Sequence, residues 1–137
     1  VIAAFAKALL TGEAGTIFGD GEQSRDFTFV DNAVEANLLA ARREAPIGGA
    51  VFNVACGGRI SVNDLYARMK QATGQGHLQA QYEPPRSGDV RHSLADLSRI
   101  QSALGYEPVV SLQAGLEKTL EWYRSTIGPS ATPADRA

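Results

Sequence analysis

One apolar run at residues 50–55 (AVFNVA) constrains the fold of this chain more than any other feature. A short apolar run between glycine-rich turns is typical of a strand buried on both faces of a parallel sheet. Glycine pairs stand at residues 48–49 and 57–58, on either side of the run. The sequence contains few other strand patterns that could pair with it. We therefore expect this strand to have open edges that a partner would need to cover.

The other patterns predict an α/β chain in which helices are mixed with a few short strands. Apolar residues at helical spacing predict helices over residues 1–10, 31–44, 61–73, 96–104 and 111–123, with Asp31, Ser61, Asp96 and Ser111 as their caps where a cap is present. Short strands are expected at residues 16–18, 27–30 and 78–82. Trp122 and Tyr123 are expected to anchor the core, and residues 128–137 are expected to be a disordered tail.

Composition restricts the classes of function. The 137 residues suffice for one domain, here residues 1–127, and the net charge of -2 gives no basic excess for nucleic acid. No apolar run is long enough for a membrane span. The single cysteine, Cys56, excludes an internal disulfide, is expected to be a buried small residue and fits a cytoplasmic location. The sequence opens inside a helix pattern without Met, as a truncated or excised fragment would.

Two arginine motifs carry most of the functional information. They are residues 19–31 (GDGEQSRDFTFVD) and residues 86–96 (RSGDVRHSLAD), and each has an arginine beside a Gly-Asp turn. A guanidinium is a planar, permanently charged fork that matches a pair of phosphate oxygens. Arg25 and Arg86 would suit a pyrophosphate if they converged on one pocket. Asp89 could accept hydrogen bonds from a ribose diol.

Each motif also has a purely structural interpretation. In the first motif, Asp20 and Asp26 could satisfy backbone donors of a turn, with Arg25 paired to one of them. The second motif could be a solvated loop, although its density of polar groups argues against this. His77 and His92 have neither metal-ligand spacing nor a nucleophile partner, and no glycine-rich phosphate or dinucleotide loop is present.

The ordered motifs resemble the C-terminal, substrate-binding half of the extended short-chain dehydrogenases/reductases, the NAD-dependent nucleotide-sugar epimerases and dehydratases. The resemblance runs from Val1 to about Tyr123, and the matching segments are IFGDG (17–21), RDF (25–27), FNV (52–54), RSGD (86–89), LGY (104–106) and WY (122–123). It implies a Rossmann-type fold whose N-terminal dinucleotide-binding half, with its catalytic Tyr-x-x-x-Lys pair, is absent here. Tyr66 and Lys70 stand at the wrong spacing for that pair, so no catalytic residue is assigned.

The resemblance also implies roles for individual residues. The backbone groups of Thr16 and Phe18 would bind a uracil or thymine base. Arg25 and Arg86 would bind the pyrophosphate, and Asp89 would bind the nucleotide ribose. These roles agree with the charge argument made above from the residues alone.

Ser93 would border the 2-substituent of the sugar and leave room for an N-acetyl group. This resembles the 4-epimerases that act on UDP-GlcNAc and UDP-GalNAc, with UDP-Glc and UDP-Gal as further substrates. NAD would be the cofactor of the parent enzyme, and the present chain alone would be inactive. The alternatives are a fragment of a dehydratase, decarboxylase or uronate epimerase, or an assembly module without catalysis. A homodimer, or a partner carrying the N-terminal half, would complete the fold.

Overall fold

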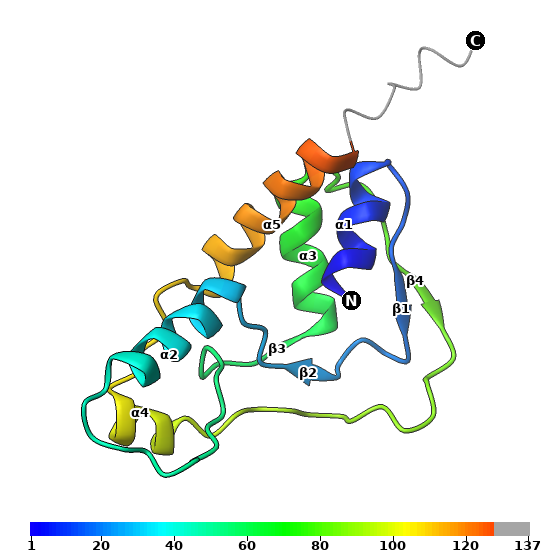
Figure 1. The fold of residues 1–137 in the computed structure, drawn as a ribbon. Coiled ribbons are helices and arrows are strands. Elements are labelled where there is room, and N and C mark those ends of the chain that lie inside the picture. Colours follow the sequence, from blue (N-terminus) through cyan, green and yellow to red (C-terminus); the bar gives the residue numbers. More distant parts are fainter. Residues whose placement is uncertain (128–137) are drawn as a thin grey trace. The chain divides into compact units, whose positions relative to one another are not determined.

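The computed structural model describes residues 1–127 and confirms the mixed α/β class (Figure 1). The elements follow the order α1 (Ile2–Leu10), β1 (Thr16–Phe18), β2 (Ser24–Arg25), α2 (Val30–Arg42), β3 (Ile60–Ser61), α3 (Val62–Ala72), β4 (Gln81–Glu83), α4 (Ser98–Leu104) and α5 (Leu112–Ile127). The tail predicted at residues 128–137 lies outside the described residues. None of the helices in residues 1–127 has the length and apolar character needed to cross a bilayer.

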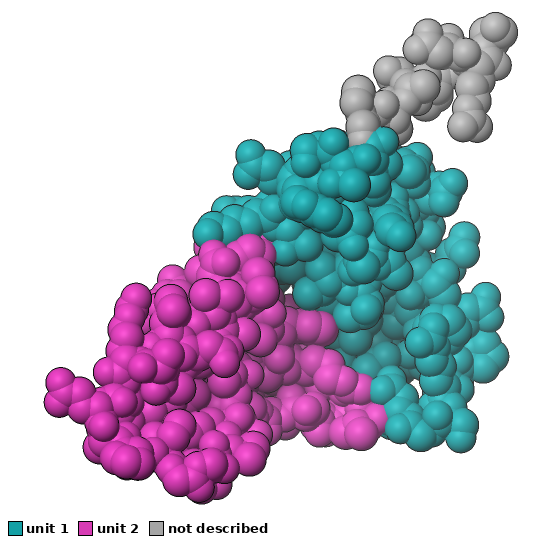
Figure 2. All heavy atoms as spheres, in the orientation of Figure 1, with its two compact units in different colours: residues 1–23, 61–89, 116–137 teal, residues 24–60, 90–115 magenta. Residues whose placement is uncertain are grey.

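The chain divides into two compact units, which Figure 2 shows in different colours. Unit 1 contains residues 1–23, 61–89 and 116 onward, and unit 2 contains residues 24–60 and 90–115. The division falls within α5, between Gly115 and Leu116. That residues 1–127 act as one nucleotide-sugar-binding region stays a prediction.

Unit 1 has a core built from helical apolar stripes. Phe5 and Leu9 of α1 and Leu65 and Met69 of α3 are buried, and α1 packs against α3. Leu120 of α5 is buried as well, as the helical spacing predicts. Burial of these side chains, each contributing about 1.5–3 kcal/mol, stabilises the packing of the unit 1 helices.

Unit 2 has a second core that is organised around a buried amide. Tyr106, which is fully buried, donates its hydroxyl to the carbonyl of Ala55 at 2.9 Å. Asn32 of α2 is also fully buried, and its Oδ1 accepts the N–H groups of Val109 (2.9 Å) and Val110 (2.8 Å). Its Nδ2 donates to the carbonyl of Val110 at 2.9 Å. One side chain thereby joins α2 to the segment that leads into α5.

The buried strand predicted at residues 50–55 is not present. Residues 51–54 form no strand, and no backbone hydrogen bond within residues 1–127 joins them to another segment. Val51 is 78% exposed, whereas Phe52 and Val54 are partly buried against the core of unit 2. A strand needs a neighbour for its backbone hydrogen bonds, and the described residues supply none here. The apolar pattern is therefore real, but the strand assignment is wrong.

Two further strand predictions are shifted along the chain. The paired segment near residues 27–30 is instead β2 at Ser24–Arg25, which pairs with β3, while Val30 already begins α2. The strand predicted at residues 78–82 is β4 at Gln81–Glu83. In both cases the position of the partner strand, not the local β-propensity, determines where pairing occurs.

The capping predictions are confirmed at two of the four helices, by Ser61 and Ser111. The Ser61 hydroxyl accepts the N–H of Asp64 at 3.0 Å, and Ser111 accepts that of Ala114 at 3.3 Å. At α4 the cap is Leu97, not the predicted Asp96. Asp96 stands one residue earlier and accepts the N–H of Ser98 at 2.9 Å, which lowers the pKa of this carboxyl. For α2 the cap is Phe29, not the predicted Asp31, which lies in the first turn of the helix.

Two predictions about burial need correction. Trp122 is 58% exposed on α5, so it is not a core anchor, although its ring meets that of Tyr123 edge-on at 4.9 Å. Cys56 is a free cysteine of intermediate exposure, not fully buried.

Candidate functional site

The β1 strand presents one backbone edge that β4 does not use. The two strands are parallel, and the carbonyl of Gly15 and the N–H of Gly19 bond to β4 at 2.9 Å each. Because bonds to one neighbour come from alternate residues, Ile17 also faces β4. The backbone groups of Thr16 and Phe18 therefore face the opposite edge. No other strand of residues 1–127 pairs with β1 there.

Gln23 contributes to this edge, although its role was not predicted from the sequence. Its Nε2 donates to the Phe18 carbonyl at 2.7 Å. A carbonyl oxygen has two lone pairs, so one acceptor position of Phe18 is taken and one is left. A polar side chain two residues before Arg25, in an otherwise turn-rich segment, was the only sequence signal for this residue.

Arg86 lies against the side chain of Phe18. Its guanidinium carbon is 3.8 Å from the centre of the Phe18 ring. Stacking uses the flat face of the guanidinium and leaves its in-plane N–H groups able to bind an anion. The N–H of Asp89 donates to the Arg86 carbonyl at 3.3 Å, through a turn in which Gly88 has a φ of +79°. Unit 1 thus places the Arg86 guanidinium on the Phe18 side chain and Asp89 in the turn that follows Arg86.

The other two predicted residues, Arg25 and Ser93, lie on adjacent backbone segments of unit 2. Ser24 and His92 form a parallel bridge, flanked by bonds from Ser24 N–H to the Arg91 carbonyl (2.9 Å) and from Ser93 N–H to the Ser24 carbonyl (3.0 Å). The Ser24 hydroxyl also contacts Nδ1 of His92 at 2.9 Å. Arg25 donates from Nη1 to the Ser24 carbonyl at 2.8 Å. Arg25 and Arg86 belong to different units, so their convergence stays a prediction.

The aspartates of the first motif have the structural role that turn chemistry predicts. Asp26 accepts the N–H groups of Cys56 (3.1 Å) and Gly57 (3.0 Å) with its two carboxylate oxygens. Asp20 accepts the N–H of Glu22 at 3.0 Å. These bonds hold the loops on either side of Arg25, and neither aspartate is needed as a base or a metal ligand to explain its position.

The N-terminus of α3, which follows a Gly-Gly pair, does not fit an NAD pyrophosphate. Such a group binds to free N–H donors at a helix N-terminus that follows a glycine-rich turn. Here α3 follows the Gly-Gly pair at residues 57–58, but its N-terminal donors are occupied. Val62 N–H donates to the Gln23 carbonyl and Asn63 N–H to the Gly21 carbonyl, both at 3.0 Å.

Solved structures of larger enzymes contain a region whose fold is similar to that of this chain. A UDP-glucose 4-epimerase from Thermotoga maritima, solved with UDP-glucose, is 42% identical with a TM-score of 0.85 and aligns with 93% of this chain and 40% of its own. A UDP-N-acetylglucosamine 4-epimerase from Methanobrevibacter ruminantium, in complex with UDP-N-acetylmuramic acid, gives 35% identity, a TM-score of 0.83 and coverage of 92% and 39%. A mutant UDP-glucuronic acid 4-epimerase from Bacillus cereus was solved with a fluorinated UDP-glucuronic acid and NAD. It is 28% identical with a TM-score of 0.85, and it aligns with 91% of this chain and 40% of its own.

The fold and these likenesses define the class: the chain is the C-terminal portion of an extended short-chain dehydrogenase/reductase fold, as the motifs predicted. Residues 1–119 match the family described as GDP-mannose 4,6 dehydratase, and the chain belongs to that family. It spans about two fifths of the length of the solved relatives. NAD is the cofactor present in relatives of this class.

Proposed function

We propose that this chain is the UDP-binding portion of an NAD-dependent UDP-sugar 4-epimerase. The observation that carries the proposal is the free edge of β1, with Arg86 stacked at 3.8 Å on the Phe18 ring. A backbone edge offers both donors and acceptors to the edge of a planar base. The adjacent guanidinium offers charge for the phosphate that follows the base and ribose.

Each predicted residue then has a separate part in binding. Thr16 and Phe18 would hydrogen-bond the uracil, and Asp89 would accept from the ribose hydroxyls. Arg25, from the first arginine motif, and Arg86, from the second, would bind the pyrophosphate. Such contacts to the non-reacting nucleotide hold the sugar in position, and this positioning supports catalysis at the sugar.

Ser93 supports a sugar pocket with room for an N-acetyl group. Its side chain is small and exposed, and its backbone is held to Ser24 at 3.0 Å. A small residue permits both the 2-hydroxyl and the 2-acetamido sugars, so UDP-GlcNAc, UDP-GalNAc, UDP-Glc and UDP-Gal are all proposed ligands.

The chemical step would belong to the remainder of the parent enzyme. There NAD would accept and return the hydride at C4 of the sugar. Because the helix donors of α3 are occupied by the carbonyls of Gln23 and Gly21, no step through NAD is assigned to this chain. We accordingly expect no epimerase activity from the 137 residues alone. Separately, we infer from the single cysteine a cytoplasmic location for the parent enzyme.

Calorimetric titration with UDP-GlcNAc tests the proposal. Arg25→Ala and Arg86→Ala should each weaken binding at least about tenfold, since a hydrogen bond to a charged group contributes about 1.5–3 kcal/mol. Arg68→Ala, which removes an exposed arginine of α3, is the matched control and should bind like the wild type. A folded wild-type chain that does not bind UDP-GlcNAc would refute the proposal.

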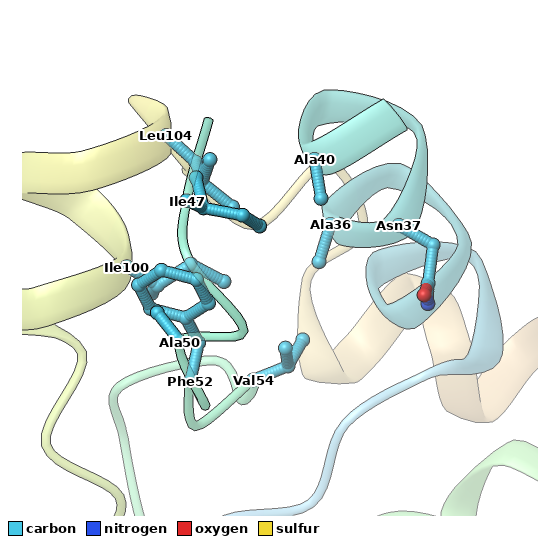
Figure 3. Close-up of a pocket in the computed structure, with 9 residues that line it drawn as sticks. All are labelled: Ala36, Asn37, Ala40, Ile47, Ala50, Phe52, Val54, Ile100 and Leu104. Carbon is cyan, nitrogen blue, oxygen red and sulfur yellow. The ribbon is translucent and has the colours of Figure 1, made fainter. Parts of the chain in front are cut away.

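A second function, as an assembly module, is favoured by the surface of unit 2. Residues 51–54 have unpaired backbone groups, and α2 exposes Val30 (62%), Val34 (50%) and Leu38 (40%) at helical spacing. A pocket of about 220 Å³, lined by apolar residues and Asn37, lies where residues 47–54 meet α2 and α4 (Figure 3). A second copy or a chain carrying the N-terminal portion would cover these groups. Light scattering that shows a monomer at high concentration would exclude self-assembly.

A further inference from the structure

The side chain of Asn63, in the first turn of α3, connects the turn between β1 and β2 to the rest of unit 1. Its Nδ2 donates to the Asp20 carbonyl at 3.0 Å and to Oε1 of Glu22 at 2.7 Å. Its Oδ1 accepts the hydroxyl of Tyr82, on β4, at 2.9 Å. Both donors and the acceptor of the amide are thus used, and they connect the turn to α3 and to β4.

Gly21 shows that the turn is fitted closely to this side chain. It is buried and has a φ of +76°, which glycine adopts without steric cost. A Cβ added to Gly21 would overlap the amide group of Asn63. The backbone N–H of Asn63 donates to the Gly21 carbonyl at 3.0 Å, so main chain and side chain act on the same turn.

The turn leads directly to the free edge of β1. Its last residue, Gln23, is fixed through its carbonyl by the N–H of Val62 at 3.0 Å, and its side chain binds the Phe18 carbonyl at 2.7 Å. Any movement of the turn would therefore move the group that occupies one acceptor position of Phe18.

We infer that Asn63 is a positioning residue for nucleotide binding, which acts by holding the turn at residues 20–23 so that the Phe18 edge keeps its geometry. The inference rests on the proposed function. Asn63 does not need to touch the ligand. Without the Asn63 side chain, the turn would become ordered only when the nucleotide binds. The entropy lost on ordering one residue would then weaken nucleotide affinity by roughly a factor of ten.

The test compares Asn63→Ala with Asn37→Ala, which removes an exposed asparagine of α2 that bonds only within its own helix. Affinities of the wild type and both variants for UDP and UDP-glucose are measured by calorimetry, at a temperature where circular dichroism shows all three proteins folded. We expect Asn63→Ala to weaken both ligands by the same factor, about tenfold. Asn37→Ala should weaken neither.

A second readout separates positioning from a general loss of stability. Amide hydrogen exchange in the Asn63→Ala chain should accelerate at Glu22 and Asn63, while the exchange of buried amides in α1 stays as in the wild type. Faster exchange throughout unit 1 would overturn the inference. If the wild type binds UDP and Asn63→Ala binds it equally well, the inference alone fails. If the folded wild type does not bind UDP, the proposed function fails and the inference with it.

Discussion

Substitution of Asn32 by alanine should destabilise unit 2 more than the removal of any single surface contact. The side chain is 0% exposed, and its loss would leave the N–H groups of Val109 and Val110 without their acceptor. The carbonyl of Val110 would lose the Asn32 amide but keep its contact with the Cys56 thiol at 3.8 Å. Each buried polar group left unsatisfied costs about 1–3 kcal/mol. The buried N–H of Val110 and the partly buried N–H of Val109 together predict a loss of about 2 kcal/mol or more, which is large against a typical total stability of about 5–15 kcal/mol.

Urea denaturation followed by circular dichroism measures this loss. Asn37→Ala is the matched control on the same helix, because Asn37 is exposed and donates only to the carbonyl of Ala33 at 2.7 Å. We expect its free energy of unfolding to change by no more than about 0.5 kcal/mol. A loss below about 1 kcal/mol for Asn32→Ala, at an unchanged denaturant slope, would refute the view that this amide organises unit 2.

Two further predictions concern the turn at Gly21 and the bond that Asp96 makes at the start of α4. Gly21→Ala should cost more stability than Gly12→Ala. Both glycines have a positive φ, but only the Cβ added at Gly21 would also displace the Asn63 side chain. Thermal melts compare the two variants, and equal losses of stability would contradict the close fit of the turn to Asn63. The N–H of Ser98 holds the pKa of Asp96 below its ordinary value, so the stability from this bond is present above about pH 4 and is lost as pH falls through the lowered pKa. Asp96→Asn should therefore differ from the wild type in urea midpoint at pH 7 and approach it in acid; a constant difference would argue against the linkage.

Local features of the chain were predictable from the sequence because their energies are local. Helical periodicity and the caps Ser61 and Ser111 depend on neighbours within a few residues, and the structure confirms them. The arginine motifs could be associated with phosphate for the same reason, since the guanidinium carries its charge and geometry in any fold. The family could be predicted as well, because the order of its motifs lies in the chain itself.

Other features depended on contacts between segments that are distant in the sequence. The pairing of β1 with β4 decides that Thr16 and Phe18 face the free edge, and this register is set some sixty residues away along the chain. Asn32 and Asn63 carry no sequence signal, because their importance lies in which distant carbonyls and N–H groups they reach. At residues 50–55 the apolar pattern predicted a strand, but a strand forms only where a neighbour satisfies its backbone, and only the tertiary structure determines whether that neighbour is present.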